Sequence, residues 1–183
     1  FKEGGTNFTN SLMVGDDATG TLNNAQKNTA LGIDVFAALT TGDNNVAVGF
    51  EALKANTTGS GNTSLGGSSL VANTTGASNV AVGTDTMGSN TEGATNTAVG
   101  LSALYANTTG SNNIAIGHDS LRFNTTASGN TAVGKKALYS TTTSGNNTAV
   151  GFQAGDAITT GDQGTYIGQD AGGSGTTGSN TAV

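Results

Sequence analysis

A five-residue motif, Asn-Thr-Ala-Val-Gly at residues 96–100, recurs along the chain at a constant interval. The glycine that closes each copy follows the previous closing glycine by 17 residues (32 − 15 = 17, and so on to 168 − 151 = 17). The ten closing glycines are Gly15, Gly32, Gly49, Gly66, Gly83, Gly100, Gly117, Gly134, Gly151 and Gly168. A disordered chain has no reason to keep such a register, so the interval predicts a repeat architecture in which each unit stacks on its neighbours.

Residues that occupy the same place in successive repeats form columns, and two of these columns predict a β-strand. The residue before each closing glycine is always aliphatic, and the residue before that is nearly always Ala or Ser. This aliphatic column includes Val48, Val82, Val99, Ile116, Val133 and Val150. Val, Ile and Thr fit a pleated surface. A helix is excluded because each apolar run is short and is bounded by Gly and Asn.

A second apolar column, mostly Leu, lies four residues after each closing glycine, and the sequence Asn-Thr-Thr-Gly follows it in several repeats. We therefore predict a strand, a tight bend at the closing glycine with φ > 0, a short second strand and a turn. Stacked in parallel about 4.8 Å apart, ten such units would form an all-β parallel solenoid roughly 48 Å long. Identical Asn and Thr side chains would hydrogen-bond from layer to layer.

The register divides the chain into a lead-in segment, residues 1–10, and a single β-solenoid array, residues 11–183, of about ten turns. In the strand that ends at Val99, Thr97 and Val99 point to one face and Ala98 points to the other. Both faces are apolar or small, and the Leu column can cover only one of them. Whichever face lies inside, the sequence predicts that another chain covers the other face.

Composition excludes several classes of function. The formal charge is −6, so no basic stripe exists to neutralise the phosphates of a nucleic acid. No run of about 18 apolar residues occurs, so we expect no membrane insertion. Cys is absent, which excludes thiolate metal sites and disulfides.

The sequence predicts no enzyme and no cofactor. The only histidine, His118, stands beside Asp119 in a variable column, without the spacing of a catalytic group, and is interpreted as a surface residue. The column two residues after the closing glycine is acidic in six repeats: Asp17, Asp34, Glu51, Asp85, Asp119 and Asp170. Oxygen-rich stripes can bind Ca²⁺. The Gly-Gly-x-Gly-x-Asp pattern of calcium rolls is absent, so we interpret this acidic column as a solvated face and predict no metal site.

The column five residues after the closing glycine is irregular and carries Lys54, Tyr105, Arg122 and Tyr139. Aromatic and Arg side chains together are typical of surfaces that recognise sugars or proteins. These four residues are the candidate ligand contacts of the chain.

The Asn-Thr-Ala-Val-Gly unit, followed by Ala-Leu and Asn-Thr-Thr-Gly-Ser, resembles two related groups of repeats. One group is the head domains of trimeric autotransporter adhesins. The closer group is the shaft repeats of phage and bacterial tail-fibre proteins of the endosialidase-chaperone type. The resemblance covers residues 11–183 and implies a left-handed parallel β-roll, three chains per fibre, a role in attachment, and a location outside the cell, at the cell surface or in a virion tail fibre.

The leading hypothesis is therefore a trimeric β-solenoid shaft that attaches to a cell or host surface, with a surface glycan or receptor as a possible partner. A second hypothesis is an extracellular filament subunit that polymerises end to end. A third is an ice-binding solenoid, because Thr pairs such as Thr57-Thr58 recur. Adjacent residues of an extended strand point to opposite faces, so these pairs would not give a flat two-row Thr array.

Overall fold

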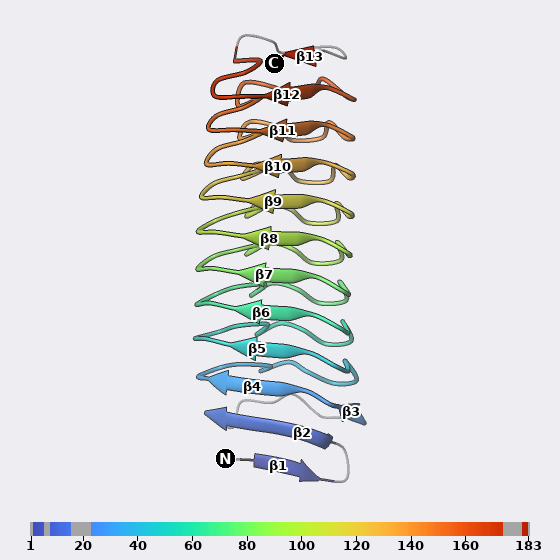
Figure 1. Ribbon diagram of the computed structural model, residues 1–183. Coiled ribbons are helices and arrows are strands. Elements are labelled where there is room, and N and C mark those ends of the chain that lie inside the picture. Colours follow the sequence, from blue (N-terminus) through green and yellow to red (C-terminus); the bar gives the residue numbers. More distant parts are fainter. Residues whose placement is uncertain (1, 6–7, 16–22, 174–180, 183) are drawn as a thin grey trace.

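The computed structural model describes residues 2–5, 8–15, 23–173 and 181–182, and these residues form one parallel β-solenoid (Figure 1). We call each 17-residue turn a rung and name it by its closing glycine. The first strand, β1 (Lys2–Gly5), pairs antiparallel with β2, whereas the later strands pair in parallel. The later strands are β2 (Phe8–Gly15), β3 (Ala25–Gln26), β4 (Thr29–Gly32), β5 (Val46–Val48), β6 (Thr63–Leu65), β7 (Val80–Val82), β8 (Thr97–Val99), β9 (Ile114–Ile116), β10 (Thr131–Val133), β11 (Thr148–Val150), β12 (Thr165–Ile167) and β13 (Thr181–Ala182).

The sheet keeps the register of the sequence from β2 to β12. Thr131 pairs with Thr148, and Val133 pairs with Val150, each 17 residues further along the chain. In Figure 1 the strands from β2 onward run from right to left at the front while successive rungs rise, so the coil is left-handed. The predicted all-β parallel solenoid is confirmed. The described residues contain no helix that could cross a membrane.

A turn with unusual backbone angles replaces the predicted second strand. In every rung from Gly32 to Gly168, the second and fourth residues after the closing glycine have positive φ, for example Glu51 (57°) and Leu53 (50°). Two positive φ angles so close together curl the chain and prevent an extended strand. The turn still bonds to the next rung, because Leu53 N donates to Ser69 O at 3.1 Å. The prediction of a second strand was wrong because apolar residues such as Leu rarely adopt this geometry.

The core lies between the strands and these turns. The Ala residues of the strands and the Leu residues of the turns point into it, and most of them are completely buried. Ala98 and Leu104 of the Gly100 rung are both 0% exposed. The structure therefore decides between the two orientations that the sequence leaves open: the Ala column faces inward and the aliphatic column faces outward.

The closing positions require glycine for two structural reasons. Gly100 has φ of 130°, as the sequence predicts for this bend. A Cβ atom added to Gly100 would lie 2.7 Å from the carbonyl carbon of Gly117. Both the backbone conformation and the close approach of the next rung exclude a larger residue at this position.

Two rows of stacked asparagines run along the interior and confirm the predicted layer-to-layer hydrogen bonds. The strand asparagine ladder contains one fully buried residue just before each strand: Asn28, Asn45, Asn62, Asn79, Asn96, Asn113, Asn130 and Asn147. The Oδ1 atom of Asn79 accepts a bond from Asn96 N at 2.9 Å. The Nδ2 atom of Asn96 donates to Gly110 O at 2.9 Å. Asn96 and its counterparts in most rungs thus connect neighbouring segments of backbone, which satisfies polar groups that water cannot reach.

The turn asparagine ladder consists of the buried residues Asn56, Asn73, Asn90, Asn107 and Asn124. Asn90 Nδ2 donates to Asn73 Oδ1 at 2.8 Å and to Gly93 O at 3.0 Å. The ladder ends at Asn124, because the next rung has Thr141 in this column. Asn124 Oδ1 is consequently a buried acceptor without a hydrogen-bond partner.

The C-terminal rung fills its core differently. Tyr166 replaces the inward-facing Ala and is only 1% exposed. Glycines surround its ring: an added Cβ would lie 3.1 Å from the ring at Gly155, 2.3 Å at Gly172 and 2.3 Å from the hydroxyl at Gly164. In other rungs these three positions usually hold Leu, Leu and Asn. The Tyr166 hydroxyl is buried without a hydrogen-bond partner, and burial raises the pKa of Tyr166.

Candidate functional site

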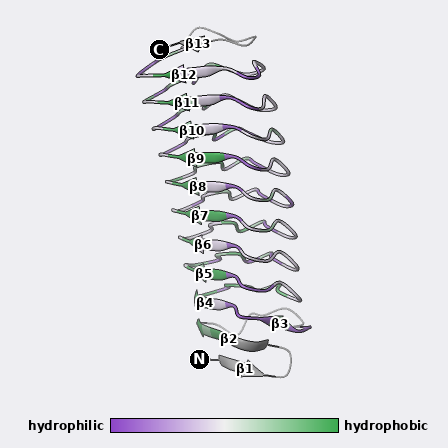
Figure 2. Ribbon diagram, turned by 45° about the vertical axis from the view of Figure 1, so that its right-hand side comes forward, coloured by the Kyte–Doolittle hydropathy of each residue, from purple (hydrophilic) through white to green (hydrophobic). Residues whose placement is uncertain are grey.

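The outer side of the sheet is an exposed apolar surface, which we call the apolar sheet face. Its side chains belong to the aliphatic column and to the residue two positions earlier, and they alternate along each strand with the buried Ala column. Its large exposed members, between 36% and 51% exposed, are Leu12, Val14, Leu31, Val46, Leu65, Val80, Val99, Ile114, Ile116, Val150 and Ile167. Figure 2 shows this hydrophobic band along the strands, with hydrophilic residues at the opposite edge of the rungs.

The apolar sheet face lacks charge. None of the strands from β4 to β12 contains Asp, Glu, Lys or Arg. A sheet that meets water on one side normally alternates apolar and polar residues. Here the outward residues are Val, Ile, Leu and Thr, a composition typical of a surface that another protein layer covers.

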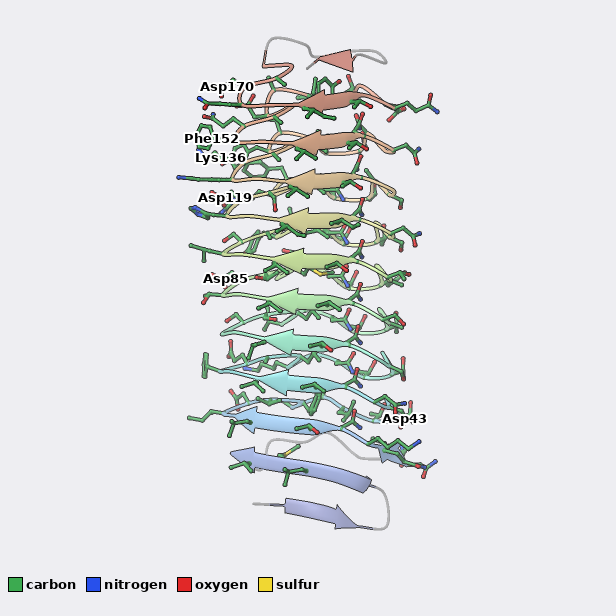
Figure 3. All side chains as sticks on the ribbon, in the orientation of Figure 1. Asp43, Asp85, Asp119, Lys136, Phe152 and Asp170 are labelled. Atoms are coloured by element: carbon green, nitrogen blue, oxygen red, sulfur yellow. The ribbon has the colours of Figure 1, made fainter. Side chains whose placement is uncertain are left out.

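Further apolar side chains stand at the bend next to this face. Ile33, Phe50, Leu101 and Phe152 each follow a closing glycine and are between 43% and 56% exposed. Phe152 lies on the same edge of the rod as Asp85, Asp119, Lys136 and Asp170 (Figure 3). The apolar surface therefore extends from the sheet onto this edge.

Three members of the acidic column, Asp85, Asp119 and Asp170, lie on the same edge in Figure 3. Asp17 lies outside the described residues. Asp34 and Glu51 share Lys54, whose Nζ atom is 3.3 Å and 2.7 Å from their carboxylates. The hydrogen bonds to Glu51 and Asp34 raise the pKa of Lys54. Among the described residues, no group of three or more His, Cys, Asp or Glu side chains could hold a metal ion.

His118 lies at the surface beside Asp119. Its Nε2 atom is 3.3 Å from Asp119 Oδ2, and its side chain is 44% exposed. Asp119 also accepts a hydrogen bond from Arg122 Nη1, which raises the pKa of Arg122. His118 therefore belongs to a surface network of charges around Asp119.

Three of the four candidate ligand contacts come together. Tyr105, Arg122 and Tyr139 occupy the same column in consecutive rungs. The guanidinium carbon of Arg122 lies 5.5 Å from the ring centroid of Tyr105, within the range of a cation–π contact. Lys54 is four rungs away from Arg122 (122 − 54 = 68, four intervals of 17) and takes no part in the group.

The structure adds two residues that the sequence analysis did not include. Phe123 packs edge-on against Tyr139, with centroids 5.0 Å apart, and lies 5.9 Å from the guanidinium of Arg122. Lys136 Nζ is 5.1 Å from the centroid of Tyr139. We call Tyr105, Arg122, Phe123, Lys136 and Tyr139 the basic aromatic cluster. A comparison of the columns two and six residues after the closing glycine in adjacent rungs could have found both additional residues.

The two Thr residues of each pair lie in different environments. The first Thr of a pair points along the rod, and Thr57 Oγ1 donates to Thr74 O at 3.0 Å. The second Thr, such as Thr58, is exposed. Because the first hydroxyl donates to the next rung, one exposed Thr row remains in this column, which does not support an ice-binding array.

Comparison with protein-family models, curated proteins and solved structures finds no match to this chain.

Proposed function

We propose that this chain is a segment of an extracellular attachment fibre in which three copies pack together through the apolar sheet face. The observation that carries the proposal is the uncharged, outward-facing aliphatic surface that runs from β2 to β12. Burying a side chain that is about 40% exposed would contribute roughly 0.5–1 kcal/mol to the free energy of association. Eleven such side chains lie on this face of each copy. The number three rests on the resemblance to fibre repeats, whereas the apolar face supports association as such.

The arrangement of the chain supports a shaft. Each rung bonds to the rungs before and after it, so the repeats form a rod with a constant cross-section (Figure 1). Burial of the apolar sheet face between copies would leave the turns exposed along the outside. The turns carry the charged residues and the basic aromatic cluster, and these are the groups available to a surface ligand.

Sedimentation velocity or mass photometry at submicromolar concentration tests the assembly. The expected mass is about three times 17.8 kDa. The variant Val99→Lys/Ile116→Lys places charges in the proposed interface and is expected to dissociate the particle. The matched control Thr109→Lys/Thr126→Lys adds the same charges to exposed turn positions and should leave the mass unchanged. A wild-type protein that remains a soluble, folded monomer would contradict the proposal.

A further inference from the structure

The basic aromatic cluster lies in a part of the rod with a positive net charge, although the net charge of the whole chain is negative. The whole chain carries a formal charge of −6, but residues 101–139, which span the cluster, contain Arg122, Lys135 and Lys136 against Asp119, a net charge of +2 (3 − 1 = 2). The next acid, Asp156, stands in the column of Arg122 in the rung after Tyr139. Half of the six basic residues of the chain therefore lie in two adjacent rungs. This charge difference attracts an anionic partner to this part of the rod.

The cations of this region differ in how they are paired. Arg122 is held by Asp119 and by the rings of Tyr105 and Phe123. The ion pairs of the described residues do not include Lys135 or Lys136. Lys136 rests on Tyr139, and Lys135 is exposed. The ammonium groups are thus free to meet an anion, while Arg122 is fixed in position and retains further N–H donors.

The aromatic groups present apolar surface next to these cations. Tyr105 is 37% exposed and Phe123 is 43% exposed. The Tyr105 ring covers Gly88 of the preceding rung, where an added Cβ would lie 2.8 Å from the ring. Ring faces of this kind pack against the C–H faces of sugar rings, and Tyr and Arg dominate the energetics of many recognition surfaces.

The cluster forms a ridge along the rod. Its residues belong to three consecutive rungs, which places them over about 10 Å of the axis at about 4.8 Å per rung. A linear polymer that lies along the axis can contact all three rungs at once. Sugar rings would pack on the aromatic side chains, and their acidic groups would meet the cations.

We propose that the basic aromatic cluster binds an acidic polysaccharide, whose sugar rings carry carboxylate or sulfate groups. This inference deepens the proposed attachment function and rests on it, because it names the chemistry of the surface to which the fibre attaches. Carboxylates and sulfates share the anionic oxygens that the cluster recognises, so both kinds of polysaccharide are included in the test.

The test measures binding of the full chain to immobilised polygalacturonate, dextran sulfate and neutral dextran by biolayer interferometry. We expect binding to at least one of the two acidic polymers, weakening as salt is raised, and none to dextran. Each substitution introduces a residue that another rung already holds in the same column, which protects the fold. Arg122→Val, Phe123→Ala and Lys136→Ser are each expected to weaken binding by about tenfold, as for residues at the centre of an interface.

The control variant is Lys54→Val, which also removes one positive charge and introduces the residue that Val71 provides in the next rung. It should change binding less than about twofold. The inference is overturned if Lys54→Val weakens binding as much as Lys136→Ser, or if no acidic polysaccharide binds. Immobilised polyglutamate is a further control, and equal binding to it would also overturn the inference, because charge without sugar rings would then suffice. A changed particle mass in the cluster variants would show a protomer contact and would also overturn it.

The two proposals fail separately. A trimer that binds none of the acidic polysaccharides contradicts the inference but leaves the proposed assembly in place. A monomer that binds dextran sulfate through the cluster contradicts the proposed assembly alone.

Discussion

The Gly100 rung and the C-terminal rung around Tyr166 solve the same packing problem with different residues. In the Gly100 rung the strand provides Ala98 and the turn provides Leu104, and both are completely buried. In the C-terminal rung, which closes at Gly168, the strand provides Tyr166. Gly172 of this rung and Gly155 of the preceding rung stand where most other turns have Leu. A large residue from the strand thus takes the place of two large residues from the turns. The comparison shows that either the strand or the turn can supply the large side chain that fills the core, whereas the side chain in a single column can change.

The first test compares the effects on stability of substituting the closing glycines of these two rungs. Gly100→Val is expected to destabilise the protein by more than about 4 kcal/mol, because it combines positive φ with a clash against Gly117. Gly168→Val has a similar positive φ of 119°, but no described atom lies within 4 Å of the added Cβ. It should therefore destabilise by only about 1–3 kcal/mol, through backbone strain. Thermal unfolding followed by circular dichroism measures both variants. Equal effects would contradict the clash between rungs.

The second test exchanges the two packing solutions. Tyr166→Ala should leave a cavity and destabilise the protein by about 3–5 kcal/mol. Adding Gly155→Leu should recover a large part of this loss, because φ at Gly155 (62°) is close to that of the Leu column. Urea unfolding of the single and double variants measures the coupling. A double variant no more stable than Tyr166→Ala would show that volume is not exchanged between strand and turn.

The third test removes the Tyr166 hydroxyl, and we expect this change to stabilise the protein, in contrast to the first two. It is buried without a hydrogen-bond partner, so Tyr166→Phe removes an unsatisfied polar atom. We expect a gain of about 1 kcal/mol, which corresponds to roughly 2–4 °C in Tm for a chain of this size. A loss of stability on scanning calorimetry would indicate that the hydroxyl has a partner.

The end of the turn asparagine ladder gives a fourth comparison. Asn90→Ala in the middle of the ladder should destabilise by about 1–3 kcal/mol, because it leaves Asn73 Oδ1 and Gly93 O without this donor. Thr141→Asn should instead extend the ladder and supply a donor to Asn124 Oδ1. Its net gain should be below about 1 kcal/mol, because the bond from Thr141 Oγ1 to Ile158 O is lost. Hydrogen exchange of the amides near Asn124 measures the local effect, and faster exchange in Thr141→Asn would contradict it.

The fifth and smallest effect concerns the strained turns. Ser68 has φ of 53°, so Ser68→Gly should relieve strain and stabilise by up to about 1 kcal/mol. Ser89, in a turn position without positive φ, is the control, and Ser89→Gly should destabilise slightly through the entropy of the unfolded chain. Gly155 in the Gly151 rung and Gly172 in the Gly168 rung already occupy turn positions with positive φ. Thermal shifts of the same sign in both variants would argue against stored strain.

Much of this fold follows from the sequence, since the interval between closing glycines determines the sheet register. The sequence could not decide which strand face is buried, because Ala98 and Val99 are both compatible with a core. The positive φ at residues such as Leu53 could not be predicted either. It accompanies hydrogen bonding to the next rung, and it opposes the preference of Leu for negative φ. Of the basic aromatic cluster, column analysis found Tyr105, Arg122 and Tyr139. Phe123 was missed because it stands in the adjoining column, and Lys136 was missed because it stands in the acidic column, two residues after the closing glycine.

The strict interval of 17 residues has a consequence for how such a solenoid can change over generations. Insertion or deletion of one whole repeat alters the length by one step of about 4.8 Å and preserves every column and the outer surface. Any other insertion within a rung would move Asn, Ala and Gly out of their columns and interrupt the interior bonding. Recombination between repeats can therefore adjust the length of the rod in discrete steps, while the apolar sheet face keeps the same composition.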